Sequence, residues 1–183
     1  MSAEGHTLKQ PVIPSMSEVD IIIANYPGEP LKGNDGTVYV TDDWAIKEIT
    51  EWKEFEPDTA QLYVDTTNTL APMQFEVMGY MLTVNPIAAM LTDPDTRRII
   101  LISKTITGEP LYKAAIPSKD ALSRELHGTL SDQMKSITRA EAIRIEPINT
   151  MVVGDKQLIV TDIGSNIWEF GEQLRKSKSL SSD

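Results

Sequence analysis

The side chains that most often carry catalysis are scarce in this sequence. It has no cysteine and only two histidines, His6 and His127, which are far apart in the chain. A general base needs a nucleophile within hydrogen-bond reach, and a zinc site needs clustered His or Cys ligands. Neither spacing occurs, and the lack of thiols also excludes disulfides and iron–sulfur clusters. For His127 we expect a place at the end of a helix, where imidazolium suits the helix dipole.

Carboxylates are the remaining candidates for acid–base chemistry or metal binding. Asp93 and Asp95 are a closely spaced pair, but Pro94 between them favours a turn. Asn34-Asp35-Gly36 matches only part of a calcium loop, so a weak surface calcium site stays an alternative there. No Gly-x-Gly-x-x-Gly, Gly-Lys-Ser/Thr phosphate loop or Gly-x-Ser-x-Gly motif is present. The sequence therefore predicts no catalytic residue, no metal ligand and no cofactor.

Charge is distributed unevenly along the chain, whose net charge is −10. Residues 1–96 hold four basic against sixteen acidic residues, whereas residues 97–183 hold thirteen basic against eleven acidic. An acidic chain does not favour general nucleic-acid binding, which needs clustered Lys and Arg. The asymmetry indicates either a solvated acidic surface or two faces that pair head to tail between copies. No apolar run could span a membrane, and no secretory signal is recognisable.

Three regions are expected along the chain: an extended arm over 1–18, one β-rich domain over 19–175, and a mobile polar tail over 176–183. The centre of the domain is its most apolar stretch, where strands at 73–84 and 97–107 are predicted to pair across a turn at 93–96. Residues 86–91 within it are either a helical turn or a strand interruption.

The remaining elements follow from hydrophobic periodicity and turn residues. We predict strands at 19–24 (paired with 37–40), 61–65, 111–116 and 142–145, a loop at 66–69 and a hairpin over 149–161; helices are predicted over 41–56, over 119–127 up to a stop at Gly128, from 131 and from 165.

These elements predict an α+β, β-rich fold. We expect a mostly antiparallel sandwich or a partly rolled barrel with three or four short helices. Regular alternation of strand and helix is lacking, so a parallel nucleotide-binding sheet is not expected.

The function that these features favour is a non-enzymatic structural or assembly protein. Its partners would be other copies of itself, in a ring or tube, and other structural proteins. Virion components such as bacteriophage tail, neck or head-completion proteins have this general character, which places the chain in a virion or, failing that, in the cytoplasm. Two alternatives stay open: a carboxylate-based or divalent-metal-dependent enzyme or ligand-binding domain, and an acidic module that regulates a host protein. The candidate interaction residues are Val12, Ile13, Trp44, Glu48, Glu51, Glu54, Arg97, Arg98 and Trp168.

Overall fold

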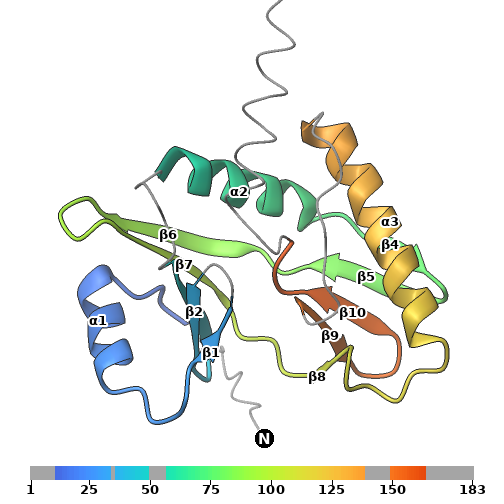
Figure 1. Cartoon of the computed structure of the whole chain (residues 1–183), viewed down its shortest axis with the longest axis horizontal. Coiled ribbons are helices and arrows are strands. Elements are labelled where there is room, and N and C mark those ends of the chain that lie inside the picture. The colour runs from blue at the N-terminus through green and yellow to red at the C-terminus, as the bar shows by residue number, and fades with distance from the viewer. Residues whose placement is uncertain (1–10, 34–35, 50–56, 139–148, 164–183) are drawn as a thin grey trace, which may run out of the picture.

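The computed structural model describes residues 11–33, 36–49, 57–138 and 149–163. Within these ranges, three helices and ten strands form two five-stranded sheets (Figure 1). The predicted α+β, β-rich class is confirmed, and the described strands make two open sheets with no closed barrel. Among the helices of these ranges, none combines the length and the apolar character that a membrane crossing requires.

The first sheet is entirely antiparallel and has the order β1-β2-β3-β7-β6. Its β2 and β3 approach so closely at Gly36 that a Cβ there would lie 2.1 Å from the Glu48 carbonyl oxygen. Only glycine therefore fits that position. The strands are β1 (Leu31–Lys32), β2 (Gly36–Val40), β3 (Trp44–Ile49), β6 (Ile87–Asp93) and β7 (Arg98–Lys104).

The second sheet has the order β4-β5-β10-β9-β8 and one parallel pair, β5 with β10. Its β4–β5 turn uses positive φ at Met78 (51°) and Gly79 (81°), the backbone that a tight hairpin requires. The strands are β4 (Phe75–Val77), β5 (Tyr80–Val84), β8 (Glu109–Pro110), β9 (Thr150–Val153) and β10 (Gln157–Val160).

Three helices cover the sheets: α1 (Met16–Ala24), α2 (Pro57–Leu70) and α3 (Lys119–Thr138). In Figure 1, α1 and α2 lie on opposite sides of β6 and β7. Val19 of α1 joins a buried cluster with Trp44, Ile46, Ile100 and Ile102. The main core, in contrast, combines α2 and α3 with strands of both sheets. Each fully buried Leu or Ile of these clusters contributes about 1.5–3 kcal/mol relative to exposure.

Strand β6 is an edge of the first sheet, and the side chain of Asn68 bonds the backbone of its first residue. The Asn68 amide of α2 donates to the Ile87 carbonyl (3.0 Å) and accepts from the Ile87 N–H (2.8 Å). This pair of bonds matches what a neighbouring strand would offer to one residue.

The predicted strand at 19–24 is wrong, because these residues belong to α1. The Glu18 carboxylate accepts from the Ser15 N–H (2.7 Å) and from the Ser15 hydroxyl (2.6 Å), which fixes the start of the helix. Strand β2 accordingly pairs with β1 and β3. Helix α1 begins at Met16, so the last residues of the expected arm are helical.

The predicted helix over 41–56 is also wrong where the structure describes it. Residues Trp44–Ile49 form β3, whose side chains alternate between the two faces of the sheet. Trp44 and Ile46 face α1, while Ile49 lies in the main core. Residues 50–56 lie outside the described ranges.

The predicted strand at 61–65 and loop at 66–69 are both part of α2. Pro57, expected to end a helix, occupies the first helical position instead, where its missing N–H costs nothing. The hydroxyls of Thr66, Thr67 and Thr69 donate to carbonyls four residues earlier, at 2.7–2.8 Å. These bonds satisfy hydroxyls that would otherwise compete with the helix.

The predicted central hairpin is partly right. The turn at 93–96 exists, but it joins β7 to β6, while β5 belongs to the other sheet. The undecided residues 86–91 largely form β6, with a bulge between Ile87 and Ala89.

Further along, the hairpin over 149–161 is confirmed as β9 and β10, with Gly154 at φ 59° in its turn. The predicted strand at 111–116 is wrong: the N–H groups of Lys113 and Ala114 bond the Pro110 carbonyl in a turn. The two predicted helices after 118 are one, because α3 continues through Gly128, beside which a Cβ would meet nothing within 4 Å. The predicted strand at 142–145, the helix from 165 and the tail lie outside the described residues.

Candidate functional site

A lysine and an aspartate that are 115 residues apart in the chain meet between the two sheets. Lys47 lies in β3 of the first sheet, and Asp162 follows β10 of the second. The Lys47 ammonium donates to Asp162 Oδ2 at 2.6 Å, and the two side chains are only 17% and 21% exposed. A partly desolvated ion pair of this kind is stronger than a surface pair, and it holds two parts of the fold together.

Helix α2 reaches the same pair through Tyr63, whose side chain is 3% exposed. Its hydroxyl donates to Asp162 Oδ1 and accepts from the backbone N–H of Ile163 (3.3 Å). Asp162 is therefore bonded through both carboxylate oxygens, to a cation from one sheet and to a phenol from a helix.

Apolar side chains of β1, β2 and β3 lie on the same face of the first sheet as Lys47. Leu31 pairs with Val38, which pairs with Lys47, so the three side chains share one face. Val40 and Ala45 belong to the same face, since they pair two residues further along. Leu31 is 63% exposed and Val40 is also exposed, which leaves an open apolar surface beside the lysine.

A glycine-flanked turn connects β1 and β2 at the end of this face. The Gly33 N–H donates to the Gly36 carbonyl at 2.9 Å, which closes the turn. On the side of Asp162, the carbonyl of Asn149 accepts from the N–H (2.7 Å) and hydroxyl (3.0 Å) of Thr161. Asn149 is thus fixed beside the residue that precedes Asp162.

The chemistry available here is charge recognition. A lysine ammonium is a compact point charge suited to phosphate, and Asp and Asn oxygens are the ligands that Mg²⁺ prefers. Val38, Val40 and Leu31 offer a flat apolar contact. Among the described residues, no group of three His, Cys, Asp or Glu side chains could hold a metal ion on its own.

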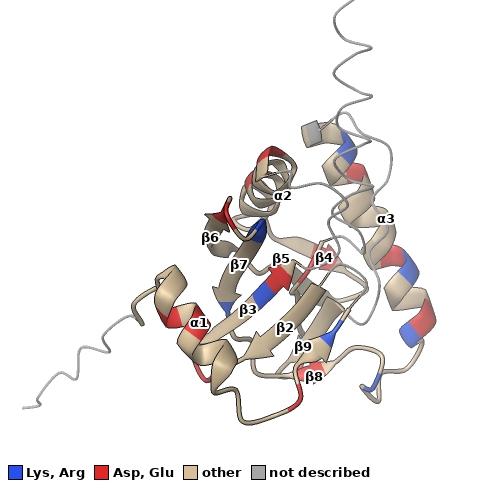
Figure 2. Cartoon of the chain, turned by 60° about the vertical axis from the view of Figure 1, so that its left-hand side comes forward, with Lys and Arg blue, Asp and Glu red and all other residues tan. Residues whose placement is uncertain are grey.

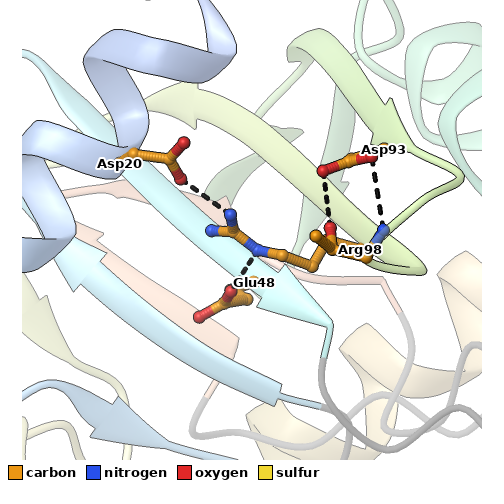
Figure 3. Close-up of polar contacts among 5 residues, drawn as sticks. Asp20, Glu48, Asp93 and Arg98 are labelled. Atoms are coloured by element: carbon orange, nitrogen blue, oxygen red, sulfur yellow. Dashed lines mark hydrogen bonds and ion pairs between the residues drawn. The ribbon is translucent and has the colours of Figure 1, made fainter.

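A second polar cluster lies on the opposite face of the first sheet (Figure 3). Arg98 of β7 donates to Asp20 of α1 (2.7 Å) and to Glu48 of β3 (2.8 Å). The hydrogen bond to Asp20, followed by the bond to Glu48, raises the pKa of Arg98 against the effect of burial. In the preceding turn, the hydroxyl of Thr96 lowers the pKa of Asp93. This cluster ties α1 to the sheet and is structural.

The predicted interaction residues are scattered over the chain. Val12 and Ile13 are exposed just before α1, and the Val12 carbonyl accepts from the Trp44 indole N–H (3.2 Å). Trp44 itself is buried in β3, so its side chain is a core residue rather than an open contact. Arg97 is exposed in the turn before β7.

Glu48 and Arg98, both candidate interaction residues, form an ion pair within one chain. Glu51, Glu54 and Trp168 lie outside the described residues. Figure 2 shows the charge asymmetry in the fold: α1 and α2 carry acidic residues and no Lys or Arg, whereas α3 carries both signs.

Sequence reasoning missed Lys47, Tyr63, Asn149 and Asp162. Lys47, Asn149 and Asp162 each stand in or after a short sequence pattern. Each pattern is a weak signal alone, but their order along the chain, taken together, could have identified these three residues. Gly33-x-x-Gly36-x-Val38 precedes Ala45-Ile46-Lys47, and Asn149 precedes Asp162-Ile163-Gly164 in the same order along the chain. Tyr63 leaves no comparable signal, because only the packing of α2 brings it to Asp162.

No family model matches the chain, and no curated protein matches it. Among solved structures, the kinase domain of Mycobacterium tuberculosis PknI, in a mutant form, is similar, with a TM-score of 0.47 and 13% sequence identity. The match covers 75% of this chain and 58% of the kinase domain.

Proposed function

We propose that this chain is a nucleotide-binding module that recognises a nucleoside triphosphate without transferring its phosphate. The observation that supports this most is the 2.6 Å ion pair between Lys47 and Asp162. It joins a lysine on a sheet strand to an aspartate that follows a hairpin of the other sheet, next to a glycine turn and an exposed apolar face.

Protein kinases hold ATP with the same kinds of residue in the same chain order. Their Gly-x-Gly-x-x-Gly-x-Val turn covers the phosphates, and the Val-Ala-Ile-Lys lysine on the third strand pairs with them. The Asn of the catalytic loop and the Asp of Asp-Phe-Gly hold Mg²⁺. This chain offers Gly33, Gly36 and Val38, then Lys47, then Asn149 and Asp162.

The donor set fits a nucleotide and its metal ion. Lys47 would bind phosphate oxygens, Asp162 and Asn149 would supply oxygen ligands, and the apolar face with Leu31 and Val40 would contact the base. A bound divalent cation would neutralise the phosphate charge.

Three departures favour binding over catalysis. The first glycine of the kinase turn is Leu31 here. In kinases the lysine pairs with a glutamate of the following helix, whereas in α2 the residue that reaches this site is Tyr63. The kinase base is an aspartate five residues before the asparagine, and Arg144 stands at that position of this sequence. An arginine cannot accept a proton from a substrate hydroxyl.

Melting of the protein with a non-hydrolysable ATP analogue and Mg²⁺ tests the binding. At a ligand concentration of about 100 times Kd, the stabilisation is about 2.7 kcal/mol, or roughly 5–10 °C in Tm for a chain of this size. Lys47→Met should remove this shift. Lys156→Met, an exposed lysine in the β9–β10 turn, is the matched control and should keep it.

Absence of any shift in the wild-type protein at millimolar analogue would overturn the proposal. A shift that survives Lys47→Met would place the nucleotide elsewhere. Incubation with labelled ATP and generic protein substrates tests the claim that the phosphate is not transferred. Transfer of label that is lost in Asp162→Asn but kept in Asp155→Asn would show catalysis and contradict this claim.

The assembly role expected from the sequence stays a prediction. Nucleotide binding and assembly are compatible, because the exposed segment with Val12 and Ile13 lies on the α1 side of the first sheet, away from Lys47.

A further inference from the structure

Tyr63 is the residue of the candidate site that the nucleotide-binding pattern does not account for. It is a buried phenol on α2, with its hydroxyl at Asp162 and at the Ile163 N–H. Since α2 packs on β5 and β6, this hydroxyl is held in place by the main core rather than by the site itself.

Two of the bonds that Asp162 makes bear directly on its ability to hold a cation. Lys47 neutralises the charge of the carboxylate at Oδ2, and the Tyr63 hydroxyl occupies a lone pair of Oδ1. A divalent cation needs both the negative charge and the free lone pairs of its ligands. Both bonds therefore compete with a cation for the oxygens of Asp162.

Resting on the nucleotide-binding function proposed above, we infer that Tyr63 is a positioning residue that, together with Lys47, keeps the affinity of Asp162 for divalent cations low, and that Lys47 gives up its share of this competition when it engages phosphate. With phosphate present, Lys47 exchanges its carboxylate partner for phosphate oxygens. The carboxylate of Asp162, still oriented by Tyr63, is then no longer paired with an ammonium group and can serve as a cation ligand. The site therefore takes the cation together with the nucleotide or after it, and binds the cation weakly on its own.

Manganese binding without nucleotide tests this directly, measured by electron paramagnetic resonance of the free ion. Tyr63→Phe keeps the ring and removes only the hydroxyl, so it should bind Mn²⁺ about tenfold more tightly than wild type, the order of effect of one hydrogen bond to a charged group. Tyr112→Phe alters an exposed tyrosine and is the matched control. Adding Asp162→Asn to Tyr63→Phe should abolish the gain, which locates the ion.

A second variant covers the case in which Tyr63→Phe does not fold. Lys47→Met removes the competing cation and should also raise the affinity for Mn²⁺ in the absence of nucleotide. An affinity that is unchanged or lower in the folded variants, or no binding at Asp162 in any of them, would overturn the inference. Because this measurement uses the metal alone, its failure is distinct from failure of the nucleotide to stabilise the protein.

Discussion

Replacing Arg98 with methionine should lower the free energy of unfolding by about 2 kcal/mol, and mostly through one of its two ion pairs. The Glu48 side chain is 16% exposed, whereas that of Asp20 is 51% exposed. A charged hydrogen bond in a partly buried place contributes about 1.5–3 kcal/mol. An exposed pair contributes about 0–1 kcal/mol and weakens with salt. Glu48→Gln should therefore cost about 1–2 kcal/mol and Asp20→Asn about 0.5 kcal/mol or less.

Urea unfolding followed by tryptophan fluorescence measures these differences, since Trp44 lies in the cluster between α1 and the sheet. With an m-value of about 2 kcal/mol/M, Arg98→Met should shift the midpoint down by about 1 M. Arg97→Met is the control: that side chain is exposed, and its φ of 56° is equally strained for both residues. It should stay within about 0.5 kcal/mol of wild type.

The reasoning is refuted if Arg98→Met is as stable as the control, or if Asp20→Asn costs as much as Glu48→Gln. The first result would mean that packing alone holds α1. The second would mean that exposure does not decide the strength of the pair. Added salt should reduce the effect of Asp20→Asn before that of Glu48→Gln.

Three further outcomes are expected. Ile100→Asp and Ile102→Asp should not fold, because a buried charge costs several kcal/mol of a total stability of roughly 5–15 kcal/mol. Thr92→Asp, at an exposed position, should fold, and denaturation curves of the three variants test this difference. The Ser15 hydroxyl, and then its N–H, lower the pKa of Glu18, so this cap stabilises α1 above the ordinary glutamate pKa of 4.5 and is lost as pH falls through the lowered value. Amide exchange of α1 should therefore differ between wild type and Glu18→Gln at pH 6 but not at pH 2. Deleting residues 1–13, which removes Val12 and Ile13 but keeps the Ser15 cap of α1, should lower the oligomeric order seen by light scattering with little change in Tm, and a wild-type monomer at tens of micromolar would contradict assembly.

Local signals predicted the elements that depend on few residues. The β9–β10 hairpin needs a glycine at positive φ, and Gly154 supplies it. The turn at 93–96 needs a side-chain acceptor, and Asp93 accepts from the N–H and hydroxyl of Thr96. Leu122 and Leu126 stand four residues apart, on one face of the helix predicted over 119–127, and both are buried. In each case the information lies within a few positions of the chain.

The errors arose where two local signals compete. Residues 19–24 are rich in β-branched side chains, yet the bonds between Ser15 and Glu18 and the packing of Val19 favour the helix. Residues 44–49 fit a helical stripe and a strand equally well, and pairing with both β2 and β7 decides for the strand. Propensity is a weak preference that tertiary contacts override.

The candidate site was missed for a different reason. The short patterns around Lys47 and Asp162 are each weak alone, and only the meeting of the two sheets shows that the two residues belong together. Tyr63 is harder still, because α2 was predicted as a strand and a loop. A constellation drawn from two sheets and a helix becomes visible only when the order of the strands is known.

The amide of Asn68 has a consequence for the ageing of the protein. It acts as a one-residue substitute for a strand at the open border of β6, and it does so with a donor and an acceptor at once. Slow hydrolysis of this amide to a carboxylate would remove the donor and set two oxygens against the Ile87 carbonyl. The beginning of β6 would then lose the side chain that covers it and would be more open to strands of other molecules, which is a route to aggregation. Hydrolysis at this one side chain would therefore connect the slow chemistry of an amide to association of the folded protein through its strand edge.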